Sequence, residues 1–415
     1  MNKIEKLLNE LCPNGVEFKS LGEVANFRRG SFPQPYTKTE WYGGEDSAPF
    51  VQVADVGDNM KLTETTKQTI SKIAQSKSVF VPKNTVIVTL QGSIGRVAIT
   101  QYDSYVDRTL AIFQSYKIPI NIKFFAYVLF MKFDEEKKKA RGGIIKTITV
   151  EEFKQFQIPI PPIEIQEEIV KILDAFTELE AELEAELEAR RRQYEYYRNK
   201  LLSFEYLDKN GGGGYKLKML GEIGKVTKLA GYEFTKYVTY SDVGNTIALR
   251  GLNIKNGHLV LDDVKYIDNS DFSKLSRSKL FIDDILFTYV GTVGQVALID
   301  KNDKYYLAPN VALIRVEENS LIPRFLMHYF QSEKFACETA RLLQNSSMKN
   351  LTMEKIRKFQ IPIPPLEVQE KIVSILDKFH ALTTDLQSGI PAEIEARKKQ
   401  YEYYRNQLLT FKEAI

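Results

Sequence analysis

The fold is decided by the stretch FQIPIPP at residues 156–162, because the same stretch returns at residues 359–365. A second stretch, QYEYYRN at residues 193–199, returns unchanged at residues 400–406. The period is about 200 residues, which is too long for a solenoid and fits duplicated domains. A chain of 415 residues built from two near-equal halves predicts a pseudo-symmetric molecule whose function needs two of something.

Composition is typical of a soluble globular protein, with 43% hydrophobic and 27% charged residues. The two cysteines, Cys12 and Cys337, have no paired spacing, which excludes a disulfide framework and a cysteine zinc site. The N-terminus carries charges where a signal peptide needs an apolar core, and no run reaches the roughly 18 apolar residues of a membrane span. We therefore expect a cytoplasmic protein. The net charge of +3 neither requires nor excludes a nucleic-acid partner.

Each half contains a globular part that repeats only faintly. LGEV at residues 21–24 matches LGEI at 220–223, and GSIGRVA at 92–98 matches GTVGQVA at 291–297. Strand-like runs and short helical patterns alternate in both parts, so we expect an α+β fold with two similar domains that differ in surface. The predicted segments are a first domain with an N-terminal helix at 1–152, a helical spacer at 153–207, a second domain at 208–355 and a second helical spacer at 356–415.

Apolar residues in steps of three and four predict that both helical spacers form coiled coils. The first seam is Ile165, Ile169, Ile172, Phe176, Leu179 and Leu183, and the second is Val368, Ile372, Ile375, Phe379, Leu382 and Leu386. The second copy carries four extra residues, about one helical turn, which returns the seam to the same face. This insertion contains Ser388-Gly389-Ile390-Pro391, where we expect the helix to stop and restart.

Connectivity predicts that the two long helices run antiparallel. The first leaves one domain and enters the other, while the second has only the first against which to bury its seam. About 40 residues at about 1.5 Å each give a rod of about 60 Å with a domain at each end, a pseudo-two-fold dumbbell. The N-terminal helix is similar to the end of the first repeat, so we expect it to meet the C-terminus.

Together these features resemble the specificity subunit of type I restriction-modification enzymes. The resemblance rests on two variable domains that alternate with repeated helices, and on a Pro-Ile-Pro-Pro segment before each helix with Gln166 or Gln369 just after it. The Leu-Gly-Glu openings and the Gly-Ser-Ile-Gly and Gly-Thr-Val-Gly loops also match. It covers essentially the whole chain.

The resemblance implies that each variable domain recognises one half of a split double-stranded DNA site and that the helical rod sets the spacing. It also implies two copies of an adenine-N6 methyltransferase, the modification subunit, and restriction subunits that translocate and cut DNA. The chain itself would be non-catalytic and hold no cofactor or metal, because S-adenosylmethionine, ATP and magnesium would be used by these partners.

The residues agree with a non-catalytic role. DNA amino-methyltransferases place a polar residue before Pro-Pro and an aromatic residue after it, whereas Ile160 and Ile163 flank the first pair here and Ile363 and Leu366 the second. The Pro-Pro pairs are therefore expected to be helix start signals. The three histidines, His258, His328 and His380, are expected to be structural.

Candidate DNA contacts are polar or basic residues on predicted loops, since base-edge hydrogen bonds specify sequence and cations hold phosphates. In the first domain they are Arg28, Arg29, Gln91, Ser93, Arg96 and Lys146; in the second they are Lys225, Lys228, Tyr289, Thr292, Asn345, Ser346 and Lys349. The alternative is that the paired glycines merely make tight turns and leave their neighbours without a role.

Candidate partner-binding residues are Gln166, Tyr196, Gln369 and Tyr403, which recur at equivalent positions of the two helices. Tyr194 and Tyr197 lie on the predicted seam and can equally belong to the core. A different class of function, a two-domain protein scaffold, stays open; a self-contained enzyme is disfavoured because no nucleophile-base, metal or phosphate-binding constellation is recognisable.

Overall fold

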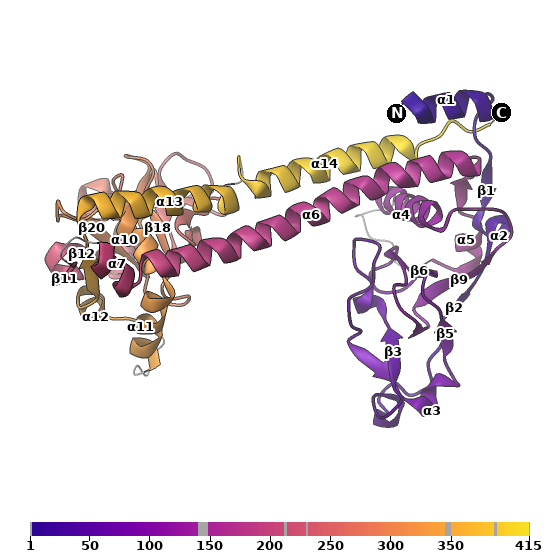
Figure 1. Cartoon of the computed structure of the whole chain (residues 1–415), viewed down its shortest axis with the longest axis horizontal. Coiled ribbons are helices and arrows are strands. Elements are labelled where there is room, and N and C mark those ends of the chain that lie inside the picture. The colour runs from indigo at the N-terminus through magenta and orange to yellow at the C-terminus, as the bar shows by residue number, and fades with distance from the viewer. Residues whose placement is uncertain are drawn as a thin grey trace. The chain divides into compact units, whose positions relative to one another are not determined.

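The computed structural model describes residues 2–139, 148–210, 214–229, 231–344, 350–385 and 388–414. The chain forms two compact units (Figure 1). Unit 1 consists of Met1–Glu182 and Glu395–Ile415, and unit 2 of Leu183–Ile394. Each unit contains one α+β domain and a part of both helical spacers, which confirms the predicted fold class of two similar domains joined by long helices.

Unit 1 contains short strands and mostly short helices. Its strands are β1 Phe18–Ser20, β2 Ala25–Arg29, β3 Ala48–Val51, β4 Gln68–Ile70, β5 Val79–Val81, β6 Val86–Thr89, β7 Val97–Ile99, β8 Ser104–Val106, β9 Leu110–Tyr116 and β10 Gln157–Pro159. Its helices are α1 Asn2–Leu11, α2 Leu21–Val24, α3 Lys72–Gln75, α4 Ile122–Lys139 and α5 Val150–Lys154, with 3-10 turns η1 Thr39–Trp41 and η2 Val53–Asp55.

The core of unit 1 lies on both faces of one antiparallel sheet of order β2-β9-β6-β7. Strand β6 is buried along its whole length. Because side chains alternate between faces, Val86 and Val88 enter the core that includes α4, while Ile87 enters the core shared with a second sheet of order β4-β3-β8-β5. This explains why Val86, Ile87 and Val88 of β6 are all apolar rather than alternating with polar residues.

Unit 2 repeats this order of elements. Its strands are β11 Lys216–Met219, β12 Gly224–Lys228, β13 Ile247–Leu249, β14 Ile254–Lys255, β15 His258–Leu259, β16 Lys265–Tyr266, β17 Ile285–Thr288, β18 Val296–Leu298, β19 Tyr305–Leu307, β20 Val311–Val316 and β21 Gln360–Ile363. Its helices are α7 Phe204–Asn210, α8 Leu220–Ile223, α9 Gly231–Tyr237, α10 Pro323–Phe330, α11 Glu333–Gln344 and α12 Met353–Arg357, with 3-10 turns η4 Gly251–Asn253, η5 Phe272–Lys274 and η6 Ser276–Ser278.

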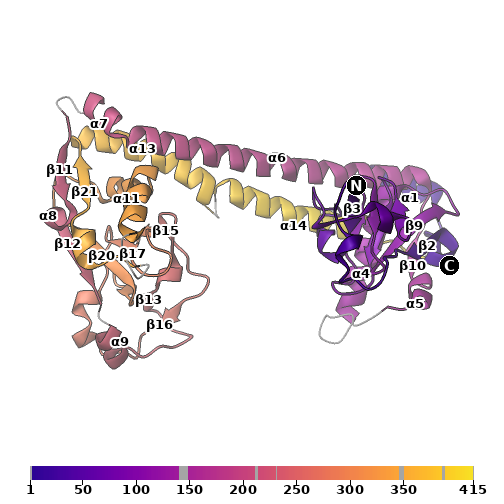
Figure 2. The same ribbon diagram turned by 90° about the horizontal axis from the view of Figure 1, so that it is seen from below.

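The sheet of order β12-β20-β17-β18 is the counterpart of the central sheet in unit 1 (Figure 2). Strand β17 is likewise fully buried. Ile285 and Phe287 enter the core beneath the helices, and Leu286 enters a second core around the sheet of order β16-β13-β19. The predicted duplication of the domains is therefore confirmed down to the alternation of side chains in equivalent strands.

The repeated FQIPIPP stretch joins each domain to its helix. Its first copy forms β10, which pairs with β1, and its second forms β21, which pairs with β11. Two helices follow these strands: α6, which runs over Ile163–Leu201, and α13, which runs over Leu366–Thr384. The strand anchors the chain by backbone hydrogen bonds, and the prolines that follow are excluded from a helix interior, so the helix begins after them.

The long helices pair antiparallel within each unit. In unit 1 the Phe176 ring stacks on Tyr404 with centroids 5.4 Å apart, and Glu180, one turn later, forms an ion pair with Lys398 at 3.3 Å. In unit 2 the Tyr197 ring stacks on Phe379 at 5.4 Å. From Phe176 to Glu180 the sequence of α6 advances, while the residues that it contacts run back from Tyr404 to Lys398. The two helical spacers therefore run antiparallel, as predicted.

The second long helix is broken where expected. Helix α13 ends at Thr384 and α14 begins at Ile390, ending at Leu408. A Cβ atom on Gly389 would lie 2.7 Å from the carbonyl oxygens of both Ala381 and Asp385, so only glycine fits at this restart. Pro391 lies in the first turn of α14, where its missing N–H costs no hydrogen bond.

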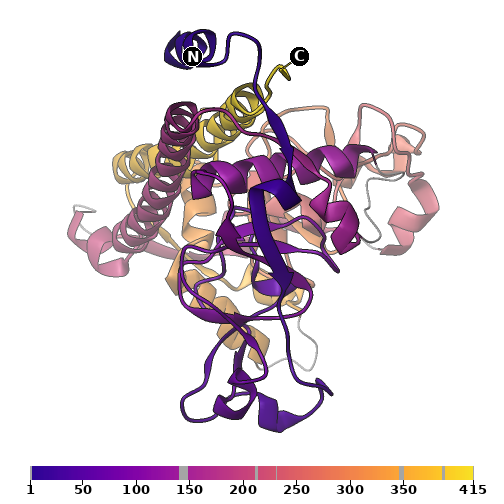
Figure 3. The same cartoon turned by 90° about the vertical axis from the view of Figure 1, so that its right-hand side faces the viewer.

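The two ends of the chain meet in unit 1, on the same side of that unit (Figure 3). The Val16 N–H donates to the Lys412 carbonyl at 2.8 Å, and the Ala414 N–H donates to the Val16 carbonyl at 3.0 Å. Ile4 of α1 packs in the same core as Leu408 and Leu409. Helix α1 thus packs in the core of unit 1 through Ile4, as α7 packs in the core of unit 2 through Leu207. This confirms the predicted meeting of the termini.

The division into two units cuts across the helices, so the four segments predicted from the sequence stay a prediction. In the part of the chain that the structure describes, no helix has both the length and the apolar character needed to cross a membrane.

Candidate nucleic-acid interface

A tight turn follows the central strand of each domain and presents polar residues to solvent. In unit 1 the Thr89 hydroxyl donates to the Ser93 carbonyl at 2.5 Å and accepts from the Arg96 N–H at 2.9 Å. In unit 2 Thr288 makes the same two bonds, to the Thr292 carbonyl and from the Gln295 N–H, at the same distances. One buried hydroxyl therefore fixes each turn.

The glycines in these turns have backbone conformations that side chains disfavour. Gly92 and Gly95 have φ of +71° and +82°, and Gly291 and Gly294 have +78° and +93°. The turn-forming role that the sequence left open for these glycines is thus present in the structure. Gln91, Ser93 and Thr292 are nevertheless exposed beside them, so their contact with DNA stays a prediction.

Replacing Gly95 and Gly294 by alanine gives a matched pair with different expected costs. Both variants place a side chain at positive φ, which costs about 1–2 kcal/mol. Only a Cβ on Gly95 also meets Phe133, at 2.7 Å, whereas one on Gly294 meets nothing nearer than Thr339 at 3.9 Å. We expect Gly95→Ala to destabilise unit 1 by about 3 kcal/mol or more and Gly294→Ala to destabilise unit 2 by about 1–2 kcal/mol, measured by urea unfolding. Equal losses would contradict the assigned role of Phe133.

Arg96 is held within its own domain. Its Nε lies 3.1 Å from an Asp58 carboxylate oxygen, and its Nη1 donates to the Val56 carbonyl at 3.2 Å. These contacts brace the loop after η2 against the turn. A role of Arg96 in binding DNA would therefore have to use the remaining donors of the guanidinium.

The other basic candidates lie on or beside edge strands. Arg28 is exposed on β2, and Arg29 next to it is half-buried. In unit 2, Lys225 forms an ion pair with Glu317 at 2.8 Å, and the Lys228 ammonium lies 5.8 Å from the centre of the Tyr289 ring. A cation on an edge strand is free to approach a phosphate backbone, so the placement suits phosphate contacts.

One further candidate, Tyr289, is buried, and four others lie outside the described residues. The Tyr289 side chain is only 8% exposed and packs in the core of unit 2, which leaves little of it open to DNA, so its contact with DNA stays a prediction. Four candidates, Lys146, Asn345, Ser346 and Lys349, lie outside the described residues.

The prediction that Gln166 and Gln369 bind a partner is wrong. Both side chains are buried, at 1% and 0% exposed. Gln166 accepts from the Asn121 N–H at 2.9 Å and donates to the Pro161 carbonyl at 2.7 Å. Gln369 makes the equivalent bonds to Ile322 and Pro364. These amides fasten the start of each long helix to its own domain.

Tyr196 and Tyr403 remain available on the surface. They are 58% and 57% exposed, and each packs edge-on against its neighbouring tyrosine with ring centroids 5.4 Å apart. Tyr194, by contrast, is buried, as the seam alternative stated. Partner binding by the two exposed tyrosines stays a prediction.

Sequence reasoning missed clusters of aromatic rings covered by cations after β2 and after β12. In unit 1, Lys77 lies 4.7 Å from the Trp41 ring centre and Arg108 lies 5.3 Å from that of Tyr36. The Tyr36 hydroxyl donates to Asp107 at 2.6 Å, and burial together with this carboxylate raises the pKa of Tyr36 to about 12. In unit 2, Lys236 lies 5.8 Å from the ring of Tyr232, which is 74% exposed.

The pair of Lys236 and the exposed Tyr232 ring is chemically suited to nucleic acid, because cations attract phosphate and exposed rings stack on bases. The Trp41 ring is only 5% exposed and is part of the core instead. The signal in the sequence was the run FPQPY at residues 32–36, which is rich in rings and proline. Its position after an edge strand became apparent only from the fold.

The three histidines of the chain, which were expected to be structural, lie close together in unit 2. The ring of His380 lies 6.1 Å from that of His258 and 6.3 Å from that of His328. His328 is fully buried; its Nε2 lies 2.7 Å from Asp377, and its Nδ1 lies 3.3 Å from the Tyr194 hydroxyl. A carboxylate only accepts, so Nε2 carries the proton and Nδ1 accepts from Tyr194. These bonds join α10, α13 and α6.

The sequence model of the type I restriction modification DNA specificity domain matches residues 13–189 and 213–396, one copy for each repeat. The chain belongs to this family. The type I specificity domain thus occurs twice, and the resemblance noted from the sequence is confirmed.

Known type I specificity subunits are similar to the chain over different lengths. A putative type I restriction enzyme specificity subunit of Haemophilus influenzae is 33% identical over 274 residues, which are 64% of this chain and 66% of the relative. The match thus spans just under two thirds of that relative. A type I restriction enzyme specificity subunit of Escherichia coli is 26% identical over 410 residues, 93% of this chain and 92% of the relative.

The type I specificity fold also has a solved counterpart. A chain from a structure of a type I R-M system, described in terms of its assembly and conformational transition, aligns with a TM-score of 0.63 and 16% identity. It covers 96% of this chain and 98% of that one, which shows a shared fold. The expected non-catalytic role agrees with the word "specificity" in the names of the relatives.

Proposed function

We propose that the chain is the DNA-recognition subunit of a type I restriction-modification complex, and that each domain reads one half of a bipartite, asymmetric double-stranded DNA site. The observation that carries this proposal is the duplication of the domains with different exposed residues on equivalent turns. Gln91 of unit 1 stands where unit 2 has the half-buried Val290, whose side chain cannot hydrogen-bond a base, whereas Ser93 and Thr292 share an equivalent position and carry the same hydroxyl group. Side chains with different donors and acceptors select different bases, so two different half-sites are expected.

The exposed aromatic and basic residues of each domain support this proposal. Arg28 and Lys228 are placed for phosphate contacts, which fix the register of a protein on a duplex. The exposed ring of Tyr232 adds apolar surface beside Lys236 in unit 2, whereas the Trp41 ring of unit 1 is buried at 5% exposed and adds none. In our proposal the turns specify bases while these groups supply affinity.

The repeated helices set the spacer between the half-sites and dock two modification subunits. Tyr196 and Tyr403 support the docking role, because they are exposed to the same extent at equivalent positions of the repeat. Large exposed aromatic residues are enriched where proteins bind one another. Two equivalent surfaces fit two copies of one partner.

The chemistry would belong to the partners. Two adenine-N6 methyltransferase subunits would use S-adenosylmethionine, restriction subunits would use ATP and magnesium, and the complex would act in the cytoplasm. Support comes from the family of the chain and from the word "specificity" in the names of its relatives.

Assembly with the modification subunit tests the proposed function. We expect the purified chain alone to show no methylation and no cleavage. With a methyltransferase subunit it should form an assembly of two modification subunits per chain, measured by light scattering, and methylate a split DNA site, measured by methylome sequencing. A one-to-one complex, or a complex that binds no DNA, would favour a protein scaffold instead.

A further inference from the structure

A cavity of about 690 Å³ lies within unit 2 between the recognition domain and the helices. One wall is formed by α11 together with the Gly294–Gln295 end of the β17–β18 turn, and the other by α6 and α13. Its volume is in the range typical of pockets for small molecules. The proposed function assigns no role to this cavity.

Three polar atoms in the lining have no hydrogen-bond partner among the described residues: His380 Nδ1, Thr339 Oγ1 and Arg198 Nε. His380 and Thr339 are only 8% and 5% exposed. A buried polar atom without a partner costs about 1–3 kcal/mol. Three such atoms around one cavity indicate that it suits a polar ligand rather than an apolar one.

The charge of the lining favours an anion. Arg191, Arg198 and Lys255 line the cavity, and Glu195 is the only carboxylate among the described lining residues. No ion pair found between described residues involves any of the three cations. Phe330 and Phe335 add apolar surface to the same lining.

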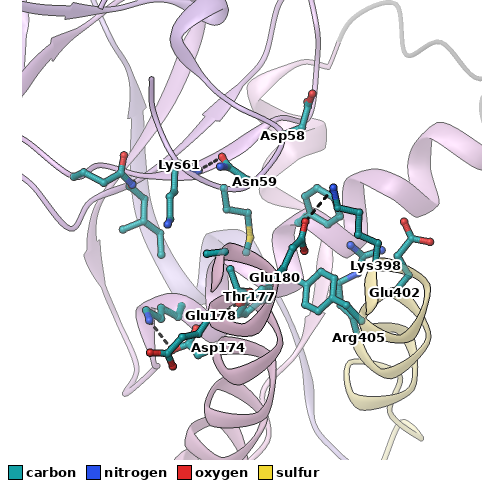
Figure 4. A pocket seen from close by; sticks show the side chains of 18 of the residues that line it. Asp58, Asn59, Lys61, Asp174, Thr177, Glu178, Glu180, Lys398, Glu402 and Arg405 are labelled. Atoms are coloured by element: carbon teal, nitrogen blue, oxygen red, sulfur yellow. Dashed lines mark hydrogen bonds and ion pairs between the residues drawn. The ribbon is translucent and has the colours of Figure 1, made fainter. Parts of the chain in front are cut away.

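Unit 1 has a cavity at the equivalent position with the opposite balance of charge (Figure 4). Five carboxylates line it, namely those of Asp58, Asp174, Glu178, Glu180 and Glu402. Two of its four cations are paired, Lys123 with Asp174 at 2.5 Å and Lys398 with Glu180 at 3.3 Å. Arg405 of this cavity occupies the repeat position of Arg198. Arg405 Nε also has no hydrogen-bond partner among the described residues, so what distinguishes unit 2 is the cationic balance of its lining together with the unpartnered atoms of His380 and Thr339.

We propose that the cavity of unit 2 binds a small anion whose phosphate or carboxylate group pairs with Arg198 and Arg191 and whose apolar body packs against Phe335. Thr339 and His380 supply further polar contacts to the ligand. Because α11 and the Gly294–Gln295 backbone form one wall, the occupant touches the recognition domain and the helices at once.

Binding of two aromatic anions, phenyl phosphate and benzoate, to the purified full-length chain tests the proposal. Isothermal titration at low ionic strength should show one saturable site for at least one of them, and the better anion identifies the preferred group. Neutral benzyl alcohol should bind at least tenfold more weakly, a difference of about 1.4 kcal/mol. Absence of saturable binding by both anions at millimolar concentration would overturn the proposal and assign the three buried atoms to solvent.

Matched variants locate the site. Arg198→Met should weaken binding at least tenfold, whereas Arg405→Met, at the equivalent position of unit 1, should leave it unchanged. Lys255→Ala changes an exposed residue and should weaken binding several-fold without affecting folding, which circular dichroism checks. Equal effects of Arg198→Met and Arg405→Met, or no effect of Lys255→Ala and Arg198→Met, would place the anion elsewhere and refute the assignment.

Discussion

Insertion of four residues into α6 beside Leu187 is expected to shift modification to a target with a longer spacer while both half-site sequences stay the same. Four residues add about 6 Å to a helix and return its stripe to nearly the same face. That length is close to the rise of two base pairs, at about 3.4 Å each. Modification of the original target should fall by orders of magnitude, because two half-sites can no longer be bound together.

The structure around Leu187 makes this insertion tolerable. Leu187 is only half-buried, and its neighbours Glu184 and Glu188 are exposed. It shares a shallow cavity with Pro391 and Ile394, at the point where the facing chain restarts as α14. A facing chain in which α13 ends at Thr384 and a new helix begins at Ile390 can adjust to a longer α6 more easily than one unbroken helix.

Methylome sequencing of a host that carries the insertion measures the result. The control is an exchange of residues 21–150 for those of a relative, which should change one half-site and keep the spacer. Altered half-sites with an unchanged spacer in the insertion variant would contradict the proposed role of α6.

Replacement of His328 by alanine is expected to lower the free energy of unfolding of unit 2 by about 3–5 kcal/mol. The variant loses a fully buried ring and leaves the Tyr194 hydroxyl and the Asp377 carboxylate without this partner. Asp377 keeps Arg324, whose Nε lies 2.9 Å away. The matched change His258→Ala removes a half-exposed ring and should cost under about 1 kcal/mol.

Acid should lower the free energy of unfolding of unit 2, because it favours the protonation of histidines that are buried in this unit. Burial lowers the pKa of His328, and it lowers that of His380 to about 4, helped by the charges of Arg324 and the other two histidines and opposed by Asp377. An unfolded histidine has a pKa of about 6.5. The unfolded chain therefore binds more protons below that pH, so stability is fully present above about pH 6.5 and falls toward pH 4. For His380 the loss reaches about 3 kcal/mol.

The two units can be followed separately. Trp41 is the only tryptophan and is buried in unit 1, so its fluorescence reports on that unit, while far-ultraviolet circular dichroism reports on both. His328→Ala should shift a dichroism transition and leave the fluorescence transition in place. His380→Thr, which introduces the residue found at the equivalent Thr177, should reduce the loss of stability between pH 6.5 and 4. An unchanged pH profile in that variant would contradict the assignment.

The local pattern of the sequence predicted the long helices and the central strands well. Steps of three and four residues specify the face that a helix buries, which is why α6 was foreseen, and the run Ser388-Gly389-Ile390-Pro391 predicted the break near Gly389. The second sheet of unit 1 was not, because it depends on pairing between distant short strands, such as Phe50 of β3 with Tyr105 of β8. No local pattern encodes such a register.

The candidate site could be predicted only in part, because local sequence patterns do not encode contacts between distant residues. The turns at Gly92 and Gly291 were recognisable because positive φ requires glycine. Gln166 was proposed to bind a partner because it recurs as Gln369, but its hydrogen bonds to the Asn121 and Pro161 backbones hold it in the interior, and the bond to Asn121 is a long-range contact that no local pattern encodes. The histidines at 258, 328 and 380 belong to three different elements, so only the folded chain brings them together.

The hydrogen bonds of Val16 with Lys412 and Ala414 have a topological consequence. Since the ends of the chain are already held together, a short linker could join them, and the chain could be opened instead between Asn210 and Gly214, at the corresponding point of the other repeat. Such a circular permutant keeps every strand pairing within both units. The order in which the two recognition domains are synthesised is thus separable from the structure they form.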